Sequence, residues 1–192
     1  MPDSLLDIAA YLADFALFLP GVLLSAGISL VAARRVGRWL AIVRPLATLL
    51  VFAVGLILSA TVTPSRGALR HGTVGTGTCD LGRVGLAPFG EILSLHDPAF
   101  NILLFLPLGL ALGSLPRSGR QIVLIVIGLI LSPAVEITQL LATSLDRACQ
   151  SSDVVDNLTG LGVGLVAGWL VRKRVPTAAG PPAEDRMGPP FR

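Results

Sequence analysis

Charged residues are scarce in this chain of 192 residues, where they account for 14% of the sequence. A soluble globular domain carries about 25% charged residues, because water must solvate its surface. Aromatic residues are also few, at 5%, so the 53% of hydrophobic residues are mostly the aliphatic and small types that are typical of packed transmembrane helices. The composition therefore excludes an ordinary soluble domain and predicts an all-α, polytopic transmembrane helical bundle.

Several motifs of enzymes and binding proteins are also missing. The sequence has no P-loop, no dinucleotide-binding fingerprint and no zinc motif, and its two histidines, His71 and His96, lack the spacing of metal ligands. Aromatic residues do not alternate with the basic ones, as they do in proteins that bind single-stranded nucleic acid. We therefore expect no metal, no cofactor and no nucleic-acid partner, in spite of a net charge of +3.

Five apolar runs are long enough, or nearly so, to cross a hydrocarbon core, which needs roughly 17–25 helical residues. They are predicted at residues 15–33, 46–62, 100–115, 121–143 and 154–171. Together they define a transmembrane domain over residues 15–174, and residues 1–14 form a short outer segment before it. Residues 175–192 are rich in Pro and Gly and poor in large apolar side chains, which predicts a disordered cytoplasmic tail.

Basic residues between the runs indicate how the bundle is oriented, because Lys and Arg in short loops stay on the cytoplasmic side. They follow the first, third and fifth runs, so alternation through five spans puts all three groups on one side. This predicts an outer N-terminus, a cytoplasmic C-terminus and a long outer loop over residues 63–98. The basic groups are Arg34, Arg35, Arg38 and Arg44, then Arg117 and Arg120, and finally Arg172, Lys173 and Arg174.

Polar side chains inside the apolar runs carry the functional information, because a charged group at the bilayer centre costs about 2.5–3.5 kcal/mol on insertion scales. Glu136 lies well inside the fourth run, and Gln139 follows on the same helical face. Other polar residues fall at a similar depth, near the outer ends of the predicted helices. The set that we expect to converge there contains Asn101, Glu136, Gln139, Arg147, Asp153, Asp156 and Asn157.

Each of these residues also has a purely structural interpretation. Glu136 and Gln139 could form a helix-to-helix hydrogen bond, and Arg147 with Asp153 could form an interfacial ion pair beside a helix cap. A stripe of small residues in the fifth run predicts that another helix packs closely against it. That stripe consists of Gly160, Gly164 and Gly168.

Cysteine is rare, and Cys79 and Cys149 are the two in the chain. The predicted orientation puts both in outer loops, where the compartment can oxidise them. We therefore expect a disulfide, which would close a loop of about 70 residues and contribute about 4 kcal/mol in the chain-entropy model. It would also hold the long outer loop over Arg147 and Asp153 as a lid. The alternative is two unpaired thiols.

Four segments, in order along the chain, resemble the VanZ-like family of bacterial membrane proteins. They are VGLAPF (84–89), NILLFLPLGLALG (101–113), VEITQ (135–139) and DRACQSSDVVDNLTGLGVG (146–164), and the resemblance extends over roughly residues 45–169. It implies a multi-pass protein of the bacterial plasma membrane, in a family whose namesake is associated with teicoplanin resistance. The family's usual Asn before Leu-x-Pro-Phe is Gly85 in this chain. The signature polar positions of the family match Asn101, Glu136, Gln139, Arg147, Asp153 and Asn157.

The resemblance and the polar set lead to hypotheses from different classes. In the leading one, the protein binds an amphipathic envelope ligand, such as a lipid-linked glycan, a glycolipid or a glycopeptide antibiotic, and contributes to antibiotic tolerance. Arg147 would hold the anionic head group, and Glu136 with Asn157 would orient it. In the second, the protein is an intramembrane enzyme in which Glu136 or Asp153 is a general base acting on a phosphoryl or acyl group of an envelope lipid. In the third hypothesis, the protein is a transporter or a purely structural partner of another protein.

Overall fold

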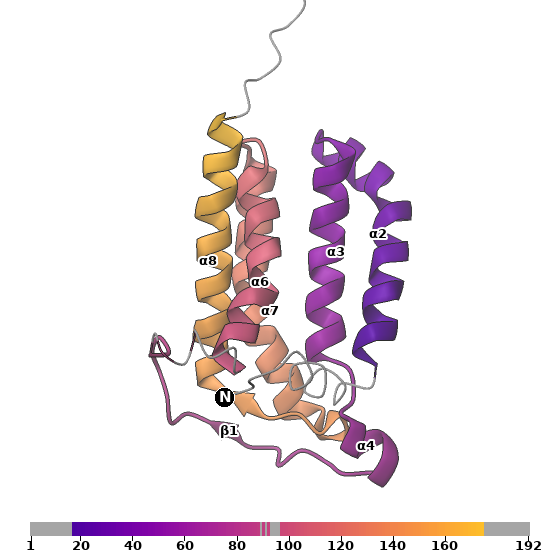
Figure 1. Ribbon diagram of the computed structural model, residues 1–192, viewed down its shortest axis with the longest axis vertical. Coiled ribbons are helices and arrows are strands. Elements are labelled where there is room, and N and C mark those ends of the chain that lie inside the picture. The colour runs from indigo at the N-terminus through magenta and orange to yellow at the C-terminus, as the bar shows by residue number, and fades with distance from the viewer. Residues whose placement is uncertain (1–16, 89, 91, 93–96, 175–192) are drawn as a thin grey trace, which may run out of the picture.

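The computed structural model describes residues 17–88, 90, 92 and 97–174, so the predicted outer segment 1–14 and the predicted tail 175–192 lie outside the described residues. Five long helices run side by side as a bundle (Figure 1). Four of them are long and apolar enough to cross a membrane, and α6 is a shorter apolar helix. The five are α2 (Phe18–Leu40), α3 (Arg44–Thr61), α6 (Asp97–Ser114), α7 (Gly119–Leu141) and α8 (Ser151–Arg174). This arrangement confirms the predicted helical membrane bundle.

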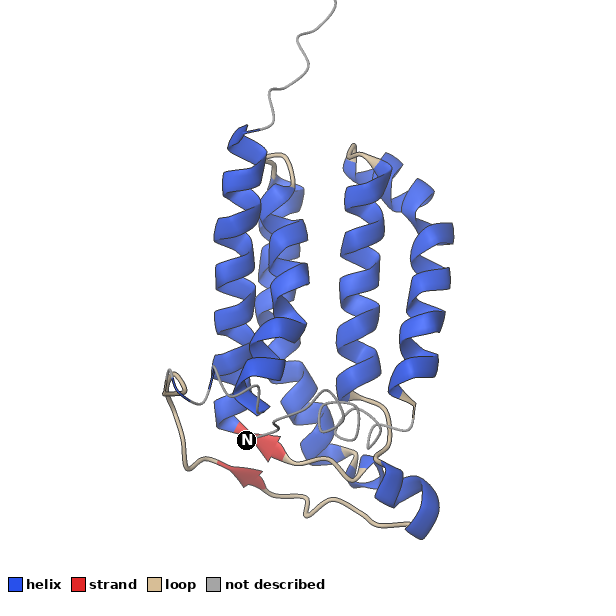
Figure 2. Ribbon diagram, viewed as in Figure 1, coloured by secondary structure: helices blue, strands red, loops and turns tan. Residues whose placement is uncertain are grey.

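The short elements of the described chain all lie at one end of the bundle (Figure 2). They are α4 (Arg66–His71), β1 (Cys79–Asp80), the 3-10 helix η1 (Thr143–Leu145) and β2 (Cys149–Gln150). The two strands pair in parallel, and Cys79 stands opposite Cys149. No hydrophobic period marks elements this short, so the sequence does not predict them.

The first long helix extends further than the apolar run that predicts it. α2 ends at Leu40 rather than at residue 33, so the predicted basic loop shrinks to residues 41–43. Arginine is a good helix former, and its charge marks where the hydrocarbon core ends rather than where the helix ends. The chain then turns at Ala41, whose φ of 56° is left-handed. The arginines that belong to the helix instead of the loop are Arg34, Arg35 and Arg38.

Among the described helices, α6 and α8 make the most extensive contact with each other. Gly160 faces the carbonyl oxygen of Ile102, and Gly164 faces that of Leu106. A Cβ atom at either glycine would overlap the opposite backbone. The stripe of small residues therefore packs as predicted, and it holds the outer turns of α6 directly beside those of α8.

The hydrophobic core lies between α3, α6, α7 and α8, and its largest fully buried apolar side chains are Ile57, Phe105, Leu112 and Leu161. The helix α2 packs mainly on α3, at the edge of the bundle (Figure 1). There the hydroxyl groups of Ser25 and Ser59 lie 3.3 Å apart, and Gly55 leaves room for Ser25. α2 is thus a peripheral helix, and its other face carries exposed apolar side chains.

The basic segments lie at the end of the bundle opposite the short elements (Figure 1). Arg120 of α7 donates a hydrogen bond to the carbonyl of Trp39 in α2 at 2.5 Å, and Arg172 of α8 donates to the carbonyl of Leu115. These contacts tie the ends of the helices together. The charge bias predicts that this basic end is cytoplasmic, and the opposite end is called the outer end below.

Candidate functional site

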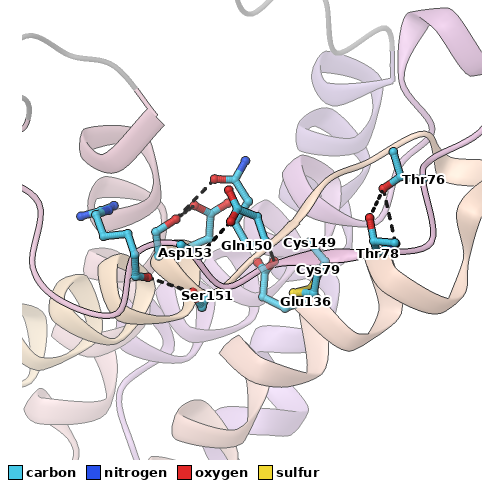
Figure 3. Close-up of a disulfide and its surroundings, with 12 residues drawn as sticks. Thr76, Thr78, Cys79, Glu136, Cys149, Gln150, Ser151 and Asp153 are labelled. Atoms are coloured by element: carbon cyan, nitrogen blue, oxygen red, sulfur yellow. Dashed lines mark hydrogen bonds between the residues drawn. A yellow bond between two sulfur atoms is a disulfide. The ribbon is translucent and has the colours of Figure 1, made fainter.

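Glu136 is buried near the outer end of α7, with 5% of its surface exposed. Its carboxylate accepts a hydrogen bond from the backbone amide of Gln150 at 2.9 Å, which joins α7 to the segment leading into α8 (Figure 3). One turn deeper, the hydroxyl of Ser132 donates to the carbonyl of Val154 at 3.3 Å and joins the same two helices. The acid therefore lies in a hydrogen-bonded junction between α7 and α8, and not on the lipid-facing surface.

Gln139, one turn from Glu136, connects α7 to a different helix. Its side-chain amide donates to the carbonyl of Thr61 at the end of α3, at 3.0 Å. Its oxygen Oε1 is buried and accepts no hydrogen bond within the described residues. Gln139 thus makes the helix-to-helix bond of the structural interpretation and still leaves one acceptor available.

One charged contact at the outer end is not predictable from helical spacing. Arg83 of the outer loop reaches Asp156 of α8, and its Nη2 lies 2.6 Å from Oδ2 of the carboxylate. Asp156 is almost fully buried, whereas 32% of the Arg83 side chain is exposed. The sequence does contain one indication of this pair, which is the opposite charge of the two residues. An outer arginine runs against the positive-inside bias, and a buried acid requires a partner.

Asn157 follows Asp156 in α8 and is 1% exposed. Its Oδ1 has no hydrogen-bond partner in the described part of the chain. Gly160, one turn further along α8, contacts Ile102 of α6. The half-buried Asn101 precedes Ile102, so the packing brings Asn101 and Asn157 to adjacent turns of the two helices.

Arg147 and Asp153 lie at the rim of the outer end, and both are half-buried. The Nε of Arg147 donates to the carbonyl of Thr63 at 3.1 Å, which fixes the start of the outer loop. Oδ1 of Asp153, in the first turn of α8, accepts a hydrogen bond from the hydroxyl of Ser152 at 3.3 Å. The structure therefore places Arg147 on the segment that connects α7 to α8, and Asp153 in the first turn of α8.

Asp146 anchors the outer loop from a position next to Arg147. Its Oδ2 accepts hydrogen bonds from the hydroxyl of Thr73 at 2.6 Å and from that of Ser65 at 2.7 Å. These two bonds, together with the positive charge of Arg147, hold the pKa of the Asp146 carboxyl below its ordinary value. The residue was not among the predicted site residues, because its role depends on the path of the loop.

The predicted disulfide between Cys79 and Cys149 is confirmed. The two residues are 70 apart in the sequence, and their Cα atoms are 4.6 Å apart. Because Gln150 follows Cys149 and donates its amide hydrogen bond to Glu136, the disulfide lies beside this buried acid (Figure 3). The bond therefore fixes the outer loop next to the junction of α7 and α8.

Hydrogen bonds hold the outer loop on both sides of the disulfide. Before it, the amide of Gly75 donates to the carbonyl of Thr143 at 2.7 Å. After it, the hydroxyl of Ser151 donates to the carbonyl of Arg83 at 2.8 Å. The described part of the loop is therefore fixed to the α7–α8 connection and to the start of α8; that it acts as a lid stays a prediction.

Several buried polar atoms at the outer end are acceptors that lack donors. Oε1 of Gln139, Oδ1 of Asp156 and Oδ1 of Asn157 have no hydrogen-bond partner within the described residues. An unsatisfied buried group costs about 1–3 kcal/mol, and each of these three oxygens is such a group. Two guanidinium groups lie beside them, of which Arg83 is paired with Asp156 and Arg147 is next to Asp146. We call this group the outer polar cluster, and it consists of Arg83, Glu136, Gln139, Arg147, Asp156 and Asn157.

Metal ligands are not gathered anywhere in the described chain. No three of its His, Cys, Asp and Glu side chains are grouped so that they could hold a metal ion. His71 is the last residue of α4, and His96 lies outside the described residues. Both cysteines are joined in the disulfide, so neither offers a thiolate.

Comparison with known proteins supports a family assignment. The family model described as VanZ/LLP1 matches residues 46–172, from the start of α3 almost to the end of α8. The match includes every residue of the outer polar cluster and begins after α2. No curated protein and no solved structure matches the chain significantly.

Proposed function

Because the chain belongs to the VanZ/LLP1 family, we propose that it is a multi-pass protein of the bacterial plasma membrane that binds an amphipathic envelope ligand at the outer polar cluster. The candidate ligands are a lipid-linked glycan, a glycolipid and a glycopeptide antibiotic such as teicoplanin. Binding of such a molecule would contribute to tolerance of the antibiotic.

The observation that carries this proposal is the set of three buried oxygens without donors, on Gln139, Asp156 and Asn157. All three are acceptors, so they favour a ligand that offers several hydrogen-bond donors. The candidate ligands share this property, because each carries sugar hydroxyl groups. A small apolar molecule would leave the three oxygens unsatisfied.

Each part of the outer polar cluster has a distinct role in the proposal. Asn157 and Gln139 accept hydrogen bonds from the sugar, and Glu136, fixed by Gln150, orients it. Arg147 at the rim holds a phosphate or carboxylate, since a guanidinium group binds such groups with two parallel hydrogen bonds. The apolar surface of the helices would accommodate the lipid part of the ligand. Asn101 and Asp153 complete the proposed site.

The proposal is tested with the full chain, purified from its bacterial host, by mass spectrometry of the lipids that remain bound. We expect a glycan-bearing lipid to co-purify with the wild-type protein and to be lost from Glu136→Gln and from Asn157→Leu. Both substitutions remove an acceptor and keep the approximate side-chain volume. The same strains are then tested for teicoplanin susceptibility, which is expected to rise in the two variants.

Thr138→Val is a matched control for these variants. Thr138 lies two residues from Glu136 in α7, but among the described residues its exposed side chain bonds only to the carbonyl of Ala134 in its own helix, at 2.7 Å. This variant is expected to keep the bound lipid and the resistance. The proposal is wrong if Glu136→Gln accumulates normally and keeps both, or if the wild-type protein carries no glycan-bearing molecule and gives no teicoplanin phenotype.

One observation favours a second candidate, an intramembrane enzyme. Glu136 and Asp153 are both linked to Gln150 (Figure 3). The carboxylate of Glu136 accepts a hydrogen bond from the backbone amide of Gln150. The hydroxyl of Ser152 contacts both the carboxylate of Asp153 and the side-chain oxygen of Gln150. Carboxylates are among the side chains that act as general acids and bases, and two of them lie near each other here. An enzyme would change the composition of the envelope lipids, so cells that lack the gene would show a missing or altered lipid species. A binding protein leaves that composition unchanged.

A further inference from the structure

Two open grooves lie on α2, on the part of the chain that precedes the family match. One has a volume of about 690 Å³ and lies at the basic end, where it is lined by Arg34, Arg38 and Arg44. The other has a volume of about 700 Å³ and runs along the exposed apolar face of α2 as far as Arg35. Both are shallow and open rather than enclosed, so they suit a ligand that lies along the helix.

The positive charge at the first groove is not neutralised by the described chain. Arg34, Arg35 and Arg38 are exposed, and the described residues form no ion pair with them. The described acidic residues belong to the outer end of the bundle. Arg44, at the start of α3, donates to the carbonyl of Leu30 at 3.3 Å, which holds its side chain against α2. The groove therefore presents several guanidinium groups that are available to an anion.

Tryptophan residues place these arginines at the depth of lipid head groups. Both tryptophans of the chain lie at the basic end, where Arg120 stacks over Trp39 at 5.8 Å and Lys173 over Trp169 at 3.7 Å from the ring centroids. Tryptophan is enriched at the membrane–water interface, where its amphipathic ring lies among the head groups. Because Arg38 is next to Trp39 in α2, its guanidinium group is expected at the level of lipid phosphates.

The second groove has the chemistry that an acyl chain requires. Its lining is aliphatic apart from Arg35, and it includes the exposed side chains of Leu24, Ile28 and Val31. Gly27 forms part of its floor, and a Cβ atom at this position would meet no other atom within 4 Å. The missing side chain thus leaves open space at Gly27 on this apolar face, whose lining ends at Arg35.

We propose that α2 binds one anionic phospholipid, with its phosphate among Arg34, Arg35 and Arg38 and one acyl chain in the groove beside Gly27. Arg38 lies three and four residues after Arg35 and Arg34, so the three side chains are neighbours on the helix surface. A zwitterionic lipid also has a phosphate, but its ammonium group would be repelled by the cluster of arginines. Free phosphate matches the charge but leaves the apolar groove unfilled.

The test uses the purified full chain in a neutral detergent, with native mass spectrometry to measure lipid binding. Phosphatidylglycerol and phosphatidylcholine with identical acyl chains are compared. We expect the wild-type protein to prefer phosphatidylglycerol, and Arg34→Gln/Arg38→Gln to reduce that preference by about thirtyfold at low salt. The magnitude follows because each basic side chain near an anionic surface contributes about fivefold.

Arg117→Gln/Arg174→Gln is the matched control, because it removes two exposed charges from the same end of the bundle but not from the groove. It is expected to keep the wild-type preference. If both double variants lose the preference equally, the attraction is a general effect of net charge and the proposed site is wrong. A wild-type protein without any preference for phosphatidylglycerol would overturn it as well.

A second pair of variants tests the acyl-chain groove. Gly27→Leu fills the groove, and we expect it to weaken phosphatidylglycerol binding while the arginines stay in place. Gly162→Leu is its control, because a Cβ atom at Gly162 of α8 also meets nothing within 4 Å. Inorganic phosphate is the remaining probe, and it is expected to compete poorly. Full competition by inorganic phosphate, or unchanged lipid binding in Gly27→Leu, would refute a phospholipid as the occupant.

Discussion

Arg83 and Asp156, 73 residues apart in the sequence, form an ion pair of 2.6 Å whose carboxylate is buried inside the bundle. The guanidinium group comes from the outer loop, and the carboxylate comes from the second turn of α8. A buried charge is tolerated when a partner compensates for its lost hydration. The pair therefore joins the outer loop to the interior of the bundle, in addition to the disulfide.

Removal of Arg83 alone should be strongly destabilising. In Arg83→Met, Asp156 remains buried without its cation, and breaking a buried pair in this way costs about 3–5 kcal/mol. Thermal unfolding of the purified protein in detergent measures the loss. The double variant Arg83→Met/Asp156→Leu removes both charges and is expected to recover most of the stability. Equal stability of the wild-type protein and Arg83→Met would mean that the pair has no energetic role.

The disulfide is expected to stabilise the fold because it lowers the conformational entropy of the unfolded chain. Replacing both cysteines with serine frees a loop of 70 residues, for which chain entropy predicts a loss of about 4 kcal/mol. The same measurement in reducing agent should lower the stability of the wild-type protein and leave the Cys79→Ser/Cys149→Ser variant unchanged. In wild-type cells, labelling of either cysteine by a membrane-impermeant maleimide before reduction would show that the bond is absent in the membrane.

The sequence predicts the elements whose signal is local. Five apolar runs give the five helices, and the shared outer position of Cys79 and Cys149 predicts their disulfide. The spacing of Glu136 and Gln139 correctly puts both on a buried face of one helix. The helices and the buried face of α7 follow from a hydrophobic period of 3.6 residues. The disulfide follows from the prediction that both cysteines lie on the same side of the membrane.

The contacts that depend on the path of a loop are not predictable in this way. Arg83 lies in a segment without periodicity, so nothing local indicates that it reaches Asp156. The donors to Asp146 are also distant in the sequence: Ser65 is 81 residues away and Thr73 is 73 residues away. The end of α2 is missed for another reason: hydropathy measures the immersed part of a helix, and Arg38 continues the helix beyond it.

Asp146 should make the docking of the outer loop sensitive to acid. The hydrogen bonds from Thr73 and Ser65 lower the pKa of its carboxyl in the folded state. In the unfolded chain the carboxyl has the ordinary Asp pKa of about 3.9 and therefore binds a proton more tightly. The stabilisation is complete above that ordinary value and is lost as the pH falls through the folded pKa. Thr73→Val removes the larger cause and should shift the titration midpoint upward. NMR titration of the Asp146 carboxyl carbon, assigned with Asp146→Asn, checks the direction of this shift.

The contact between α6 and α8 provides a prediction with an internal control in the same helix. In Gly160→Ala, the new methyl group overlaps the carbonyl of Ile102, so the helices must move apart. Overpacking of this kind costs about 1–3 kcal/mol, and more where rigid backbone is the obstacle. Gly162→Ala adds the same methyl group at a position where nothing lies within 4 Å. It should be neutral or stabilising by up to about 1 kcal/mol, since alanine has the better helix propensity. The expected order of stability in detergent is therefore Gly162→Ala at or above the wild-type protein, and Gly160→Ala well below both. Similar stability of the two variants would contradict the close packing at Gly160. Helix propensity alone predicts the same change in stability for both substitutions.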